Sequence, residues 1–195
     1  MKELIFATAN QHKVDEVSKI TDHSKYLFKS LSDVGITEDV AETGSTLEEN
    51  ALIKARYVYH KLATDVFSED TGLEVKALDG APGVITARYG GPDKDAEQNM
   101  SRLLSELEGV EDRSAQFRAV IALIIDGQEV LFEGIVTGTI ATTRSGSDGF
   151  GYDPIFIPTG YDKTFAELPD EIKLDMSHRT RAISKMVDFL ASLSQ

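Results

Sequence analysis

Apolar and polar positions along the chain follow first a strand pattern and then a helix pattern. Residues 4–8 form a short apolar run that is typical of a buried strand. Asn10 can then cap a helix, whose inward positions are Val14, Val17 and Ile20. The sequence therefore predicts that the chain opens with a strand, a turn and a helix.

A second helix is predicted from two overlapping capping boxes. Ser45 and Thr46 are each followed three residues later by a Glu, and apolar residues continue at helical spacing as far as Leu62. Two short strands are predicted next, at residues 66–68 and 73–78, with the polar residues 69–72 between them. Turn residues at 79–83 end the second of these strands.

The rest of the chain predicts a helix, a hairpin, a loop and a final helix. Apolar spacing marks a helix over residues 100–107, and segments 116–125 and 128–141 are β-rich. Asp126-Gly127 between them is the signature of a tight antiparallel hairpin. A Gly/Ser-rich loop leads to residues 150–154, and the last helix carries apolar positions from 182 to 193. Alternation at the start and a hairpin in the middle predict an α/β fold with a mixed sheet.

Composition narrows the class of protein. The 195 residues are 41% hydrophobic with five Pro and no repeat, which fits one domain over 1–195. The absence of Cys excludes disulfides, thiolate catalysis and zinc fingers. A net charge of −13 disfavours long nucleic acids as partners. The longest apolar run, 119–125, is far below the ~18 residues of a membrane span, and no signal-peptide region is recognisable. We therefore expect a cytoplasmic protein that makes no membrane contact.

The turn between the first strand and the first helix can bind a phosphate. Backbone N–H groups and the positive end of the helix dipole converge there with an ammonium group. The segment consists of Thr8, Ala9, Asn10, Gln11, His12 and Lys13. An ordinary Asn cap beside a surface Lys is the alternative explanation. The chain has no Walker lysine, and its His residues lack the spacing of metal ligands.

Several carboxylates lie where an α/β fold opens its ligand crevice, at strand ends and helix starts. Glu42 precedes the helix that carries Lys54, and Glu69 and Asp70 follow a predicted strand. Mg²⁺ prefers such oxygen ligands, usually one or two carboxylates together with substrate phosphates. A metal–phosphate site is one interpretation, and a set of solvated acidic residues is the other.

Two segments near the C-terminus carry groups suited to a ligand. Phe150, Gly151, Tyr152 and Asp153 place two aromatic rings and a carboxylate on a glycine-containing loop, which suits stacking on a base and accepting hydrogen bonds from it. A hydrophobic loop under the sheet is the alternative. Lys173 and residues 177–181 form a basic cluster in an acidic protein, which indicates an anionic or carbonyl-bearing ligand, or simply a helix capped at residue 177.

Taken in order, these segments resemble the inosine triphosphate pyrophosphatase family over nearly the whole chain. The matching blocks lie within 8–16, 42–55, 69–73, 82–89, 149–156, 164–168 and 173–182. The resemblance implies hydrolysis of deaminated purine nucleoside triphosphates (ITP, dITP and XTP) to the monophosphate and pyrophosphate, with Mg²⁺ as cofactor. It also implies an elongated mixed β-sheet flanked by helices, two lobes with a central active-site cleft, and a homodimer.

The resemblance also implies a role for each phosphate-site residue. The turn at 8–13, Lys54 and Lys173 hold the triphosphate, and Glu42 and Asp70 bind Mg²⁺. Asp70 is also implied as proton acceptor for the attacking water. Because a bound cation lowers the basicity of its ligand, Asp70 can instead orient a metal-bound water, with Glu69 as an outer participant.

By the same resemblance, the base stacks on Phe150, Tyr152 and Asp153 shape its pocket, and His178 and Arg179 reach its edge. Thr71 stands where bacterial members commonly carry Ser, and it keeps a hydroxyl for a phosphate or base contact. Hypoxanthine presents O6 and N1–H where adenine presents an N6 donor, so ATP would leave a donor such as Arg179 and an acceptor such as Asp153 unpaired.

Two alternatives remain open from the sequence. One is a pyrophosphatase of related fold that acts on other modified nucleotides, such as methylated pyrimidines; the block at 177–179 argues against it. The other is a nucleotide sensor that binds without turnover. The intact acidic and basic residues of the phosphate site argue against the sensor.

Overall fold

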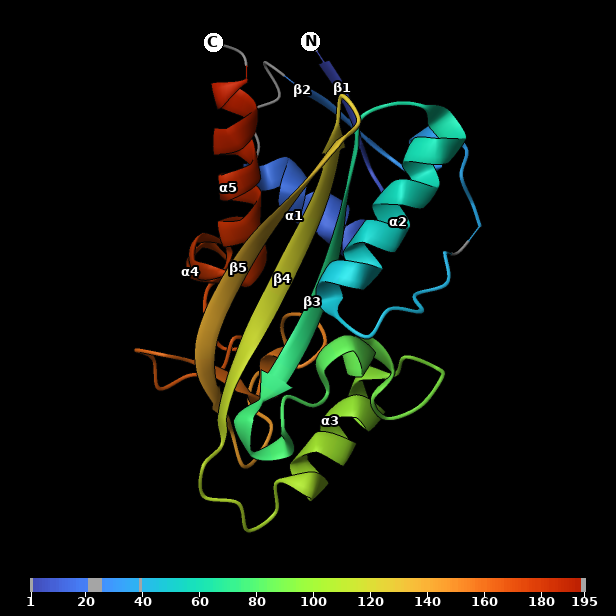
Figure 1. Cartoon of the computed structure of the whole chain (residues 1–195). Helices are drawn as coiled ribbons and strands as arrows, with labels where there is room; N and C mark the ends of the chain where they lie inside the picture. The colour runs from blue at the N-terminus through green and yellow to red at the C-terminus, as the bar shows by residue number, and fades with distance from the viewer. Residues whose placement is uncertain (1, 21–25, 39, 194–195) are drawn as a thin grey trace. The chain divides into compact units, whose positions relative to one another are not determined.

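The chain folds around one mixed sheet of six strands (Figure 1). The computed structural model describes residues 2–20, 26–38 and 40–193, and the side chains of Lys2, His12 and Ile20 lie outside this description. The strand order is β2-β1-β3-β4-β5-β6. β1 pairs in parallel with β2 and β3, whereas β5 pairs antiparallel with β6, which confirms the mixed α/β sheet. The strands are β1 (Lys2–Phe6), β2 (Tyr26–Ser30), β3 (Val66–Val75), β4 (Ser114–Ile125), β5 (Gln128–Ile140) and β6 (Phe156–Pro158).

Five α-helices flank the strands among the described residues. They are α1 (Gln11–Ile20), α2 (Leu47–Leu62), α3 (Ala96–Glu106), α4 (Asp170–Met176) and α5 (His178–Ser192). Of the two predicted capping boxes, that of Thr46 and Glu49 is the one confirmed, because the Thr46 hydroxyl accepts the N–H of Glu49 at 3.1 Å. The Glu49 carboxylate accepts the N–H of Ser45 at 2.6 Å. These bonds satisfy backbone donors that the first helical turn cannot pair by itself.

The predicted hairpin is also confirmed. β4 and β5 are neighbours in the sheet and are joined by Asp126-Gly127 alone. Both residues have positive φ, +49° and +78°, as a type I′ turn requires.

The prediction of two strands separated by residues 69–72 is wrong. One continuous strand, β3, runs from Val66 to Val75, and residues 76–78 form a 3-10 turn. Polar residues normally interrupt a buried strand, but here their side chains have partners. Ser68 donates to the backbone oxygen of Ala51 in α2, and Glu69 is held in ion pairs. The polar stretch therefore belongs to a central strand and is not a loop.

The chain divides into two compact units. Unit 1 comprises residues 1–70, 119–134 and 179–195, and unit 2 comprises residues 71–118 and 135–178. The boundary falls within β3, β4 and β5, so each of these strands supplies residues to both units. One functional domain over 1–195, with a cleft between lobes, stays a prediction.

Unit 1 is a sheet covered by helices on both faces. Alternate residues of β1 and β4 pack with α1 and α5 on one face, and α2 lies on the opposite face (Figure 1). The core on the α1 and α5 face contains Leu4, Phe6, Val17, Phe67, Ala119, Ile121, Leu123, Ile125, Ala182, Ile183, Met186 and Leu190. This arrangement fixes the helices on each side of β3, and they supply the charged side chains described below.

Unit 2 has a core of its own, rich in aromatic residues. Phe117 of β4 packs on Phe156 with ring centroids 4.7 Å apart, and Phe156 packs on Phe165 at 5.2 Å. Met100, Leu103 and Leu107 bring α3 onto the same core. β4, β6 and α3 therefore share one core in unit 2.

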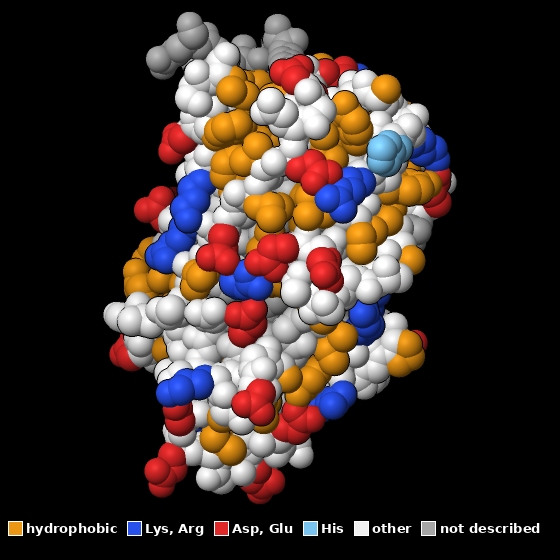
Figure 2. All heavy atoms as spheres, in the orientation of Figure 1, with side chains coloured by type: hydrophobic (Ala, Val, Ile, Leu, Met, Phe, Trp, Pro, Cys, Tyr) orange, Lys and Arg blue, Asp and Glu red, His pale blue; other side chains and the backbone are white. Residues whose placement is uncertain are grey.

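The surface carries both signs of charge. On the face drawn in Figure 2, acidic and basic side chains are interspersed, and the basic ones form no continuous stripe. Every helix in the described part of the chain is too short or too polar to cross a membrane.

Candidate functional site

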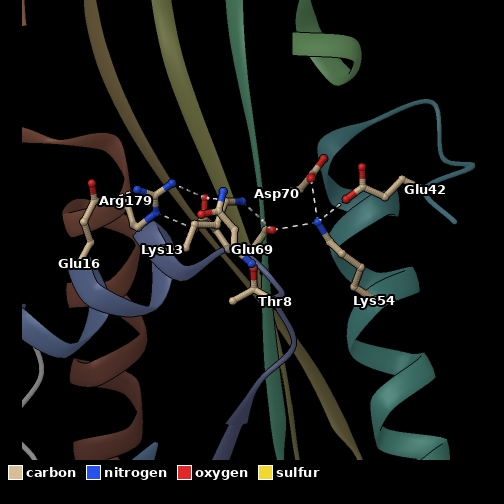
Figure 3. Close-up of polar contacts among 9 residues, drawn as sticks. Thr8, Lys13, Glu16, Glu42, Lys54, Glu69, Asp70 and Arg179 are labelled. Atoms are coloured by element: carbon tan, nitrogen blue, oxygen red, sulfur yellow. Dashed lines mark hydrogen bonds and ion pairs between the residues drawn. The ribbon is translucent and has the colours of Figure 1, made fainter. Parts of the chain in front are cut away.

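Two adjacent residues of β3 supply carboxylates to opposite faces of the sheet. Side chains alternate along a strand, so Glu69 points toward α1 and α5 while Asp70 points toward α2 (Figure 3). Both are buried: the Glu69 side chain is 0% exposed and that of Asp70 is 10% exposed. Burying a charge is costly unless it is paired, and each carboxylate has cationic partners.

On the α2 face, Lys54 joins Asp70 to Glu42. Its ammonium group donates to Glu42 Oε1 at 2.7 Å and to Asp70 Oδ1 at 2.8 Å (Figure 3). It also donates to the backbone oxygen of Glu69 at 2.9 Å. Burial would lower the pKa of Lys54, but the two carboxylates outweigh burial and raise it, so Lys54 stays charged. Burial raises the pKa of Asp70, and Lys54 offsets this only in part.

On the α1 and α5 face, Glu69 is the centre of a second set of ion pairs. Arg179, the second residue of α5, donates from Nε to Glu69 Oε2 at 2.6 Å and from Nη2 to Oε1 at 3.3 Å. Arg179 Nη1 donates to Glu16 of α1. Lys13 lies 3.4 Å from Glu69 Oε1, and its ammonium group donates to the Glu69 backbone oxygen at 3.3 Å. Burial lowers the pKa of Lys13, while Glu69 and Glu16 outweigh burial and raise the pKa of Arg179.

We call these seven residues the charged network. Its members are Lys13, Glu16, Glu42, Lys54, Glu69, Asp70 and Arg179. All of them belong to unit 1, and the backbone oxygen of Glu69 accepts from Lys13 and from Lys54, which links the two faces. The structure thus brings together the predicted residues Lys13, Lys54, Glu42, Asp70 and Arg179.

The segment that carries Glu42 is fixed by a residue for which the sequence predicted no role. Asn50, buried on α2, accepts the N–H of Gly44 with its side-chain oxygen at 2.8 Å. A Cβ at Gly44 would lie 2.7 Å from that oxygen, so only glycine permits this close approach. A buried Asn on the apolar face of a helix was the available signal, because a buried amide needs a partner.

The predicted phosphate turn connects β1 to α1 as expected. The backbone oxygen of Asn10 accepts the N–H of Lys13 at 3.1 Å, and the Thr8 hydroxyl accepts the N–H of Asn10 at 3.1 Å. Ala9 and Gln11 are exposed, and the side chain of His12 is outside the described residues. The turn therefore presents a helix start next to Lys13, which suits an anion.

In unit 2, residues 149–153 form a segment that we call the aromatic loop. Phe150 is 59% exposed, and its N–H donates to Asp153 Oδ2 at 2.7 Å. Lys173 of α4 pairs with the same oxygen. Tyr152 is 3% exposed and donates its hydroxyl to the Thr86 backbone oxygen at 2.8 Å. The two aromatic residues of the loop thus have different surroundings.

The other predicted residues are less closely grouped. His178 packs on Phe117 with ring centroids 5.1 Å apart. Thr71 is a half-buried residue of β3, and Gly151 has φ +63° in the aromatic loop. His178 belongs to unit 2 although its neighbour Arg179 belongs to unit 1. Arg179 itself is engaged by two carboxylates, and its contact with a base stays a prediction.

Glu42 and Asp70 are the residues suited to a divalent cation. Their oxygens both lie within 2.8 Å of one cationic atom, Lys54 Nζ, so the two carboxylates converge on a common point. Among the described residues there is no group of three or more His, Cys, Asp or Glu able to hold a metal. A pair of carboxylates fits Mg²⁺, which takes its remaining ligands from water and substrate phosphates.

Sequence comparisons place this chain among well-described relatives. A model of the Ham1 family matches residues 4–189. The dITP/XTP pyrophosphatase of Flavobacterium johnsoniae is 47% identical over 190 residues, which cover 97% of this chain and 98% of that protein. The dITP/XTP pyrophosphatase of Porphyromonas gingivalis is 48% identical over 191 residues, which cover 97% and 98%.

Solved structures agree with the sequence matches. The Staphylococcus aureus Ham1 protein superposes with a TM-score of 0.91 at 42% identity, covering 98% of this chain and 99% of its own. A HAM1 protein from Coxiella burnetii gives a TM-score of 0.92 at 34% identity, covering 98% and 100%. Both the fold and the full length of the chain are therefore shared with these proteins.

Proposed function

The chain belongs to the Ham1 family, and we propose that it hydrolyses deaminated purine nucleoside triphosphates (ITP, dITP and XTP) to the monophosphate and pyrophosphate. Relatives named dITP/XTP pyrophosphatase match it along nearly its entire length. The observation that carries the proposal is the convergence of Glu42, Lys54 and Asp70, because it combines two oxygen ligands with a fixed cation. Such a set is suited to a phosphoric anhydride and not to a neutral substrate.

In this proposal, Glu42 and Asp70 hold Mg²⁺. When bound, the metal supplies Lewis-acid stabilisation of negative charge on phosphate oxygens. The ammonium groups of Lys13 and Lys54 bind further phosphate oxygens, and the turn at 8–13 adds backbone N–H donors. The backbone oxygen of Glu69 accepts from both ammonium groups, so both are held beside β3.

Asp70 is the residue we assign to the attacking water, as proton acceptor or as the group that orients it. Burial raises the pKa of Asp70, whereas a bound Mg²⁺ would lower the basicity of the carboxylate, so both roles are kept in the proposal. Attack at the α-phosphorus then releases pyrophosphate. Glu69 does not face the same side of β3, so we assign it to the positioning of Lys13 and Arg179.

Unit 2 supplies the residues that we assign to the base. Phe150 offers an exposed ring for stacking, and Tyr152 and Asp153 hold the loop that carries it. His178 and Arg179 are the candidates for the base edge. A site that pairs O6 and N1–H rejects adenine because its own polar groups would be left unpaired, an effect on the scale of about 10⁴ in kcat/KM.

The proposal is tested by an assay of the purified protein with ITP, XTP, ATP and GTP in the presence of Mg²⁺. Monophosphate, diphosphate, phosphate and pyrophosphate are resolved for each substrate. We expect IMP and pyrophosphate from ITP, with little turnover of ATP. Release of phosphate would indicate a phosphatase and contradict attack at the α-phosphorus, and tight ITP binding without turnover would indicate a sensor.

A homodimer and a cytoplasmic location complete the proposal, and both follow from the family resemblance. Light scattering coupled to gel filtration tests the dimer directly. A mass near 21.4 kDa would contradict it, since that is the mass of one chain.

A further inference from the structure

We propose that Asp153 is a positioning residue. It fixes the backbone of Phe150 so that the exposed Phe150 ring serves as the stacking platform for the base, and it does not itself contact the base. This inference rests on the proposed function, since a platform has a role only if a purine stacks on it. The family resemblance places Asp153 in the base pocket as an acceptor for a hydrogen bond from the base, and the proposal gives its carboxylate a different role. The contacts of that carboxylate support this role.

The Asp153 carboxylate is used within unit 2 itself. Its Oδ2 accepts the N–H of Phe150 at 2.7 Å, and the ammonium group of Lys173 pairs with the same atom. The backbone of Asp153 is fixed as well, because its N–H donates to the Phe150 oxygen and its oxygen accepts from Ala166, both at 3.2 Å. The side chain is 9% exposed. A buried carboxylate that accepts a backbone N–H three residues earlier is a device for fixing a turn.

The turn needs such a device because its backbone is unusually free. Gly149 has φ +99° and Gly151 has φ +63°, so a glycine stands on each side of Phe150. Glycine populates many conformations, and a loop that contains two of them does not hold one shape without added bonds. A Cβ on Gly149 would lie 2.9 Å from the Lys173 ammonium and 2.9 Å from the Asp153 Cβ. The loop, the carboxylate and the lysine therefore fit as one unit.

The two aromatic residues of the loop differ in burial, and this difference indicates the role of the Asp153 contacts. Tyr152 is buried in the core of unit 2 and anchored by its own hydroxyl, so folding accounts for its position. Phe150 is 59% exposed, the highest value among the described large hydrophobic residues classed as exposed. A buried ion pair that fixes the backbone of an exposed ring contributes little to the core. It does keep the ring in one place for a planar ligand to stack on.

The test is a double-mutant cycle on ITP hydrolysis with Asp153→Ala, Phe150→Ala and the double variant. Base–aromatic stacking predicts that Phe150→Ala lowers kcat/KM by about 5- to 150-fold. Asp153→Ala is expected to lose a comparable factor, mainly through KM. In the Phe150→Ala background, Asp153→Ala should change kcat/KM by less than about twofold, because the platform is already gone.

If the losses in kcat/KM of the two single variants multiply in the double variant, the proposal is overturned, since Asp153 would then act on the substrate independently of Phe150. Asp148→Ala is the matched control: it removes an exposed carboxylate from the preceding loop and should leave kcat/KM unchanged. If Asp153→Ala does not fold, Asp153→Leu replaces it in the same cycle, because Leu has no acceptor for the Phe150 N–H.

Hydrogen exchange of the Phe150 amide gives a readout that does not depend on activity. We expect faster exchange in Asp153→Ala than in wild type and in Asp148→Ala; equal protection would overturn the positioning role. If wild type releases no pyrophosphate from ITP, the proposed function fails and this inference fails with it. If wild type is active and the cycle is additive, only this inference fails.

Discussion

The charged network of unit 1 and the aromatic loop of unit 2 are built in different ways. In the network, buried charges lie on a central strand and on helices, and each ion pair constrains several elements together. In the loop, an exposed ring stands between two glycines and one carboxylate fixes its backbone. Changes in the network should therefore alter stability or turnover, whereas changes at Phe150 or Asp153 should alter affinity for the base.

Removal of the metal should have the largest effect. We expect EDTA to abolish turnover and Mg²⁺ to restore it, because the phosphate charge would lose its principal counter-charge. The melting temperature should change little, since Lys54 pairs with Glu42 and Asp70 in the structure described here. Turnover that persists in EDTA would contradict the metal assignment.

Asp70→Asn should have the next largest effect. Loss of a group that accepts a proton or orients water lowers kcat by about 10²- to 10⁴-fold, while ITP binding is retained. Single-turnover kinetics and calorimetric titration with ITP measure the two quantities separately. Asp188→Asn, an exposed carboxylate on α5, is the matched control. Equal loss in both variants would remove Asp70 from the reaction.

Arg179→Ala tests the network for stability. It leaves Glu69 buried without its main partner, which typically costs about 3–5 kcal/mol of unfolding free energy. Urea unfolding measures this loss, and Arg181→Ala, exposed on the same helix, should stay within about 0.5 kcal/mol of wild type. Arg179→Ala should also narrow the preference for ITP over ATP. An unchanged ratio would exclude Arg179 from base recognition and leave it a structural role.

Tyr152→Phe should have the smallest effect. It removes one hydrogen bond, to the Thr86 oxygen, which is worth about 1 kcal/mol of stability. Thermal unfolding measures this change, with Tyr161→Phe at an exposed position as control. The ITP to ATP ratio should stay the same, because the ring of Tyr152 lies in the core. A changed ratio would place Tyr152 in the base pocket itself.

Local signals explain what could be predicted of the fold. The start of α2 was readable because its capping side chains are three residues from the groups they bind. The hairpin at Asp126-Gly127 was readable because few residues adopt positive φ there. β3 was divided wrongly because its polar residues find their partners on α1, α2 and α5, which are distant in the sequence.

For the candidate site, the sequence predicted which chemical groups are present better than how they are arranged. Residue types and their order indicated carboxylates for a metal, lysines for phosphate and an aromatic loop for a base. The position of Asn50 on the apolar face of α2 indicated that its amide needs a partner, but not that the partner is the segment of Glu42. No pattern indicated that Asp153 binds the backbone of Phe150. Both contacts are between polar atoms whose geometry depends on a glycine turn, and a linear pattern does not record geometry.

By itself, the sequence determined the element types, the mixed α/β class and the chemical groups available, because capping, periodicity and turn chemistry act over a few residues. Only the tertiary structure decided which face of the sheet each group occupies and which groups contact one another. The alternation of β3 sends Glu69 to one face and Asp70 to the other. Arg179 reaches Glu69 across 110 residues of chain. Such pairings depend on which elements pack together, and that is decided by burial over the whole sheet and not by neighbours in the sequence.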